Sequence, residues 1–128
     1  MIYTGYYSFV HKYTQAGLKL ISISVSEPPL MPLDGKIPSL APDKQILFDF
    51  KNGIIDEMEY TSRYLTQLDN IGIREILRHI HKYGDDVVLL CWEHPSKFCH
   101  RHILADYINK RTKLNIEEYP NGKSTVQI

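Results

Sequence analysis

Hydrophobic and polar positions alternate in segments that predict strands near both ends of the chain. Residues 2–6 are rich in β-branched and aromatic side chains, and residues 18–25 alternate mostly apolar with polar positions, as a strand does. Residues 87–92 form an unbroken apolar run, which is typical of a strand buried on both faces of a parallel sheet. Residues 114–119 alternate weakly and are predicted as the last strand.

Apolar residues at helical spacing predict helices between these strands, over residues 8–16, 43–51, 56–68, 73–83 and 99–111. Asp56 is followed by Glu59 three residues later, a capping-box arrangement that indicates a helix start. Residues 26–42 contain five of the seven prolines, so we expect a long loop without regular elements there.

Strands alternating with helices predict an α/β fold, a small Rossmann-like and mainly parallel sheet flanked by helices. The length of 128 residues suits a single domain, which we place at residues 1–119. Residues 120–128 are polar and are expected to form a flexible tail. Ligands of such folds bind beyond the carboxyl ends of the strands.

Charge and hydropathy restrict the kinds of partner that we expect this protein to bind. Fifteen basic and fifteen acidic residues give a formal net charge of zero, which argues against bulk binding of duplex nucleic acid. No apolar run is long enough to span a bilayer, and no secretory leader pattern is visible. We therefore expect a cytoplasmic protein without a membrane partner. The oligomeric state is left open.

The segment after the apolar strand carries the most informative chemistry. Cys99, His100 and Arg101 fall at the predicted start of a helix, where free N–H groups and the helix dipole favour an anion. The Arg101 guanidinium suits phosphate, and the same field would make Cys99 more thiolate-like and hence a candidate nucleophile. Glu93, at the end of the strand, is a candidate general acid or base. His100 and Arg101 are the predicted anion-binding residues.

Each of these residues also has a plainer interpretation. Arg101 and His102 could lie on a solvated first turn, and Cys91 suits packing inside the core. Both cysteines, with His94 and His102, have the types and pair spacing of a zinc site, but the four residues between the pairs make tetrahedral closure demanding. We therefore predict no metal, and two unbonded cysteines, with Cys91 buried and Cys99 nearer the surface.

Two other chain turns should meet this segment at the carboxyl ends of the strands. Tyr6 and Tyr7 follow the first predicted strand, and Ser26 follows the second. A tyrosine ring can stack on a nucleobase, although packing at the edge of a core is its commoner use. Tyr6, Tyr7 and Ser26 are therefore predicted ligand-binding residues.

The sequence resembles the domain-of-unknown-function 488 family of bacteria and phages. The resemblance is carried by an apolar strand that ends in a Leu-Cys-x-Glu pattern and by a Cys-His-Arg helix start, here Leu90, Cys91, Glu93, Cys99, His100 and Arg101. A subgroup also carries Leu-Ala-Pro and then Ile-Asp-x-x-x-Tyr, here Leu40-Ala41-Pro42 and Ile55-Asp56 with Tyr60. The resemblance extends to about Tyr119 and implies a Rossmann-like α/β fold. It implies no reaction.

One departure from the family pattern bears on anion binding. The family's second strand commonly ends with an Arg close to a Pro, whereas this chain has no Arg between Ser24 and Pro28. Either that contact is lost, or Lys97 or Lys44 replaces it.

These features together predict a protein that binds a phosphorylated small molecule, a nucleotide or nucleoside derivative, and acts on it. The alternatives are a module that senses or sequesters a nucleotide without catalysis and a small structural zinc domain. Nothing in the sequence requires a cofactor.

Overall fold

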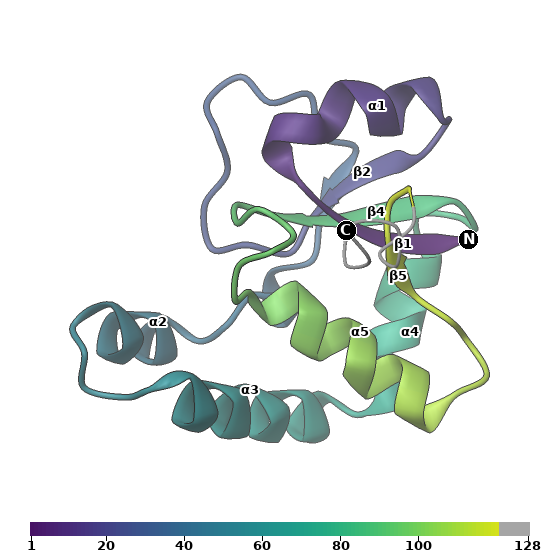
Figure 1. The fold of residues 1–128 in the computed structure, drawn as a ribbon. Coiled ribbons are helices and arrows are strands. Elements are labelled where there is room, and N and C mark those ends of the chain that lie inside the picture. The colour runs from purple at the N-terminus through teal and green to yellow at the C-terminus, as the bar shows by residue number, and fades with distance from the viewer. Residues whose placement is uncertain (121–128) are drawn as a thin grey trace.

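A five-stranded parallel sheet forms the centre of the molecule (Figure 1). The computed structural model describes residues 1–120. The strand order is β3-β2-β4-β1-β5 and every pairing is parallel. The strands are β1 (Ile2–Tyr6), β2 (Lys19–Ser22), β3 (Gly35–Lys36), β4 (Val87–Cys91) and β5 (Glu117–Glu118). The predicted α/β class with a mainly parallel sheet is confirmed.

Helices cover both faces of this sheet. They are α1 (Val10–Gln15), α2 (Lys44–Lys51), α3 (Glu57–Ile71), α4 (Ile73–His81) and α5 (His100–Arg111), with short 3-10 helices at Tyr7–Phe9 and Pro38–Leu40. In Figure 1, α1 lies on one side of the sheet, and the other four helices lie on the opposite side. The connection through α1 leads the chain toward the β3 edge of the sheet, and the connections through the other helices lead it toward the β5 edge. Right-handed connections that run in opposite directions must lie on opposite faces.

The central strand β4 shows why these residues form a buried strand. Val88 and Leu90 pack on the side of α1, in a cluster with Tyr13. Val87 and Leu89 face the larger core, which lies between the sheet and α3, α4 and α5. A strand buried on both faces must be apolar throughout, and that is the pattern of 87–91. Cys91 follows the same alternation and points toward the α5 side.

Two acidic caps set the helix starts that frame the site. The Asp43 carboxylate accepts a hydrogen bond from the Gln45 backbone N–H and opens α2. The Asp56 carboxylate accepts one from the Glu59 backbone N–H and opens α3. Each cap satisfies a backbone donor that has no partner within the helix. The predicted start of the third helix at Asp56 is confirmed to within one residue.

Two predicted boundaries are wrong. The proline-rich segment does contain regular structure, because Gly35–Lys36 pairs with β2 at the edge of the sheet, where flanking prolines cost no ladder hydrogen bond. The last strand is two residues long, not six, because only Glu117–Glu118 pairs with β1. Residues 121–128, most of the predicted tail, lie outside the described part of the chain. Among the described residues, no helix combines the length and the apolar character needed to cross a membrane.

Candidate functional site

A cavity of about 430 Å³ lies at the carboxyl ends of β2 and β4. The loops after these two strands, the start of α5, the second half of α2 and one side chain of α3 line it. The lining residues are Ser24, Val25, Ser26, Pro42, Leu47, Phe50, Lys51, Tyr60, Cys91, Trp92, Glu93, Phe98, Cys99 and His100. The cavity therefore lies where the sequence analysis expected a ligand to bind, at the carboxyl ends of parallel strands.

Three rings from different elements form an aromatic wall of the cavity. Phe50 of α2, Tyr60 of α3 and Phe98 before α5 pack with centroid distances of 4.9 to 5.5 Å. Burial raises the pKa of Tyr60, and the nearby Glu93 carboxylate adds to the shift, so Tyr60 stays a neutral phenol. The three rings pack edge to face or tilted, so the wall offers an apolar surface of ring faces and edges with one phenol hydroxyl.

Trp92 is the more exposed aromatic residue of the cavity lining. Its indole is half exposed, and its Nε1–H donates to the Ser26 carbonyl oxygen at 2.8 Å. The ring also packs edge-on against Tyr7. This bond ties the residue after β4 to the loop after β2, two chain segments that lie 66 residues apart in the sequence.

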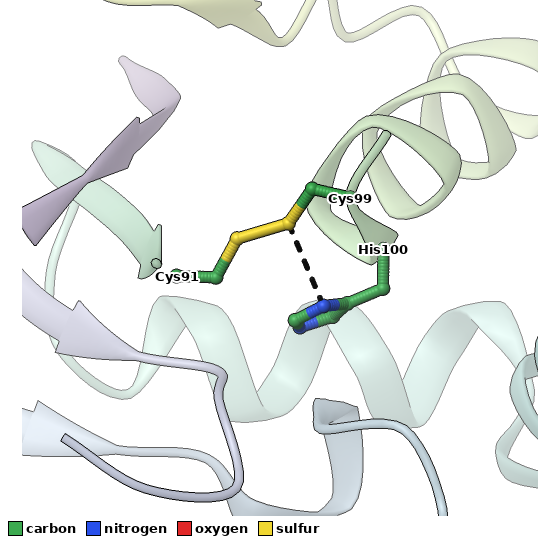
Figure 2. Close-up of side chains that lie close together, drawn as sticks. All are labelled: Cys91, Cys99 and His100. Carbon is green, nitrogen blue, oxygen red and sulfur yellow. Dashed lines mark hydrogen bonds between the residues drawn. A yellow bond between two sulfur atoms is a disulfide. The ribbon is translucent and has the colours of Figure 1, made fainter. Parts of the chain in front are cut away.

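Cys91 and Cys99 are joined by a disulfide that lies on the inner surface of the cavity (Figure 2). The prediction of two unbonded cysteines is therefore wrong. The reason is tertiary, because the loop after β4 turns back so that the start of α5 meets the end of that strand. Cys91 is buried as predicted, but Cys99 is only 6% exposed and does not lie near the surface.

His100 lies beside the disulfide, and its ring bonds to the backbone of the loop that follows β2. Its Nε2 bonds to the Ile23 carbonyl oxygen, and its Nδ1 lies 3.7 Å from Cys99 Sγ (Figure 2). Burial lowers the pKa of His100 to about 4, so the ring is neutral near pH 7. Because a carbonyl only accepts hydrogen bonds, the ring carries its proton on Nε2 and presents an unprotonated Nδ1 to the sulfur.

Arg101 occupies a fully buried position directly after His100. Its Nε and Nη2 donate to the two carboxylate oxygens of Glu118 at 3.0 and 2.9 Å, and its Nη1 lies 2.9 Å from Cys91 Sγ. The solvated first turn considered for Arg101 is wrong, because an acid from β5 neutralises the guanidinium inside the core. A contact between Arg101 and a bound anion stays a prediction, and Arg101 is not part of the cavity lining.

Glu93 and Lys51 supply the charged groups of the cavity. Both are exposed and both line it, Glu93 from the loop after β4 and Lys51 from the last turn of α2. Lys51 was missed by the sequence analysis, since only the packing of α2 beside the end of β4 brings it there. Neither Lys44 nor Lys97, the predicted substitutes for the missing arginine, belongs to the lining.

The three remaining predicted ligand-binding residues are placed differently from one another. Ser26 lines the cavity. Tyr7 is buried behind it, where its hydroxyl bonds to the Ser22 and Ser24 hydroxyls. Tyr6 stacks on Phe9 and is not in the lining. Tyr7 thus supports the site from behind, and the role predicted for Tyr6 has no counterpart in the cavity.

The zinc alternative is weakened by the same geometry. Among the described residues, the metal-ligating types that converge are Cys91, Cys99 and His100, without His94 or His102. Zinc takes thiolate sulfurs, and both sulfurs here are bonded to each other.

Comparison with models of known protein families identifies the family of this chain. A family described as the active DUF488-N3 subclade matches residues 25–112, from the loop after β2 to the end of α5. The chain belongs to this subclade of the DUF488 family. The matched range contains every residue of the cavity lining except Ser24. No curated protein and no solved structure is significantly similar to the chain.

Proposed function

We propose that this DUF488-N3 protein binds a phosphorylated small molecule, a nucleotide or nucleoside derivative, in the cavity beside Cys99 and acts on it. The observation that carries the proposal is that one cavity is lined by an aromatic wall, a cation (Lys51) and an acid (Glu93). Its volume of about 430 Å³ falls within the range of ligand pockets, roughly 300–1,000 Å³.

The aromatic residues support recognition of a flat ring. A base that enters the cavity would stack on a ring of this wall or on the indole of Trp92, all of which line it. Stacking of bases on aromatic side chains contributes about 1–3 kcal/mol each. The Ser24 and Ser26 side chains offer hydroxyls for polar edges of the ring.

Lys51 is the cation that we assign to the phosphate. It replaces Arg101 in this role, because the Arg101 guanidinium already binds Glu118 and lies behind the disulfide. The start of α5 adds free N–H groups at the same end of the cavity. His100 contributes as a neutral ring, which can bind but adds no charge.

Two groups are placed for chemistry on the bound molecule. Glu93 lines the cavity at the end of β4, within reach of a proton on a ligand there, and we assign it the role of general acid or base. Cys99 is the candidate nucleophile, and it can act only when the bond to Cys91 is open.

The test compares binding of nucleosides, nucleoside monophosphates and inorganic phosphate by isothermal titration calorimetry. Lys51→Met should weaken binding of the best monophosphate by about 1.5–3 kcal/mol, the range for a hydrogen bond to a charged group, and leave the matching nucleoside unaffected. Lys44→Met is the matched control, because Lys44 is an exposed lysine at the other end of α2. Equal loss in both variants, or binding of no member of the panel, would contradict the proposal.

A binding module without catalysis is the second candidate. It is favoured by the disulfide, which leaves neither cysteine free as a nucleophile. In that case Glu93→Gln and Cys99→Ser keep full affinity, and liquid chromatography finds the ligand unchanged after long incubation with the parent protein. An enzyme converts the ligand and loses turnover in both variants.

A further inference from the structure

We infer that Cys91 and Cys99 form a redox-active pair for a small dithiol, in which Cys99 Sγ is the sulfur attacked and Cys91 leaves as a thiolate. This activity is separate from the proposed ligand binding. It rests on the unequal surroundings of the two sulfurs, on their place in the cavity, and on the cation behind one of them.

Cys91 faces a buried cation. Arg101 is 0% exposed, and its Nη1 lies 2.9 Å from Cys91 Sγ. The Glu118 carboxylate takes the Nε and Nη2 edge of the guanidinium, which leaves Nη1 directed at the sulfur. A charge-assisted hydrogen bond in a dry environment stabilises a thiolate strongly, and an arginine stays charged at every accessible pH.

Cys99 faces a neutral acceptor instead. The His100 Nδ1 lies 3.7 Å from Cys99 Sγ, and the Nε2–H on the other side of the ring is held by the Ile23 carbonyl oxygen. After reduction, the Cys99 thiol can donate its S–H to Nδ1, which favours the protonated form. The two sulfurs are therefore distinguished as a thiolate site and a thiol site.

Access comes through the cavity. Cys91 and Cys99 are 2% and 6% exposed, yet both belong to the cavity lining. The cavity volume of about 430 Å³ accommodates a small dithiol. In thiol–disulfide exchange the better leaving group is the more stable thiolate, so attack falls on Cys99.

The exchange balances with the dithiol as reductant. One thiolate of the dithiol attacks Cys99 Sγ, and the S–S electron pair leaves with Cys91 Sγ, beside Arg101. The second thiol of the dithiol then attacks its partner sulfur in the mixed disulfide, closes a cyclic disulfide and releases Cys99. The dithiol loses two electrons and two protons. Cys99 takes up one proton, and the other goes to solvent because Cys91 remains a thiolate.

The direct test measures the thiol pKa of each cysteine alone, by thiolate absorbance at 240 nm during a pH titration. In Cys99→Ser, the Cys91 thiol should titrate at least one unit below the ordinary thiol value of about 8.5. In Cys91→Ser, the Cys99 thiol should titrate at or above that value. The reverse order, or equal values, would overturn the inference.

A second measurement uses the unaltered chain and so does not depend on how the variants fold. Protein treated with the thiol oxidant diamide should contain no titratable thiol, and reduced dithiothreitol should release two. During brief exposure to glutathione followed by acid quenching, peptide mass spectrometry should find the glutathione adduct on Cys99. An adduct on Cys91, or two thiols that persist after oxidation, would overturn the inference.

Discussion

His100 shows how one buried side chain makes stability depend on pH. Burial lowers its pKa to about 4 in the folded protein, whereas the unfolded chain has the ordinary value of about 6.5. Between these values the unfolded state binds a proton that the folded state does not. Stability from this group is complete above about pH 6.5 and is lost as the pH falls toward 4.

We expect His100→Gln to reduce this acid sensitivity. The difference of about 2.5 units corresponds to roughly 3 kcal/mol in the free energy of unfolding, so the parent should lose that much more than the variant between pH 7 and pH 4. Urea denaturation at a series of pH values measures it. His81→Gln, an exposed histidine near the end of α4, is the control and should follow the parent. Parallel curves for the parent and His100→Gln would contradict the account.

At the scale of elements, one buried ion pair joins α5 to two strands. Arg101 of α5 binds Glu118 of β5, and the Thr4 hydroxyl of β1 donates to the same carboxylate at 2.7 Å. The two-residue strand β5 also pairs with β1, and the neighbouring Ile116 backbone bonds to Asn109 of α5, so this ion pair is one of several contacts that hold β5 at the sheet edge. Removing one partner leaves the other charge buried without compensation.

Glu118→Gln should lower the free energy of unfolding by about 3–5 kcal/mol, the usual cost of breaking a buried pair. Glu117→Gln, on the adjacent half-buried residue, is the matched control and should cost well under half as much. Chemical denaturation of both variants decides the matter. An equal and small effect in both would show that the pair does not hold β5.

The same pair shows what the sequence could and could not predict at this scale. The local pattern predicted the start of this helix at Cys99, one residue before the observed start of α5 at His100. The burial of Arg101 could not be foreseen, since its partner lies 17 residues further on and meets it only when β5 joins the sheet. The weak alternation of residues 114–119 predicted a six-residue strand, whereas only Glu117–Glu118 comes close enough to β1 to pair with it.

At the scale of the whole molecule, the sheet and its helices could be predicted from the sequence, but only some of the residues that line the cavity could. Apolar periodicity gave the parallel sheet and its helices, and the carboxyl-end rule gave the location of Glu93, Ser26 and Cys99. The aromatic wall and Lys51 depend on how α2 and α3 pack beside β4, which no local pattern encodes. The disulfide likewise depends on the path of a loop, not on the spacing of its cysteines.

Opening the disulfide should destabilise the whole chain. The bond closes a loop between residues eight positions apart, and a loop of that size contributes about 2–3 kcal/mol in the chain-entropy model. Urea denaturation with and without a phosphine reductant should show this difference in the parent. Cys99→Ser should show no dependence on the reductant. A parent that is equally stable in both conditions would contradict the role of the bond.

The central claim is that the cavity binds a nucleotide-like ligand, and Trp92 allows it to be tested directly. The chain has one tryptophan, and it lines the cavity, so emission excited at about 295 nm, where the nine tyrosines absorb little, reports on this site. Titration with a panel of nucleoside monophosphates should give a saturable change in Trp92 emission for at least one member. In Lys51→Met, the midpoint of that titration should rise about tenfold or more, as loss of a charged hydrogen bond requires. An emission that stays unchanged across the panel, or an identical midpoint in Lys51→Met, would contradict the account.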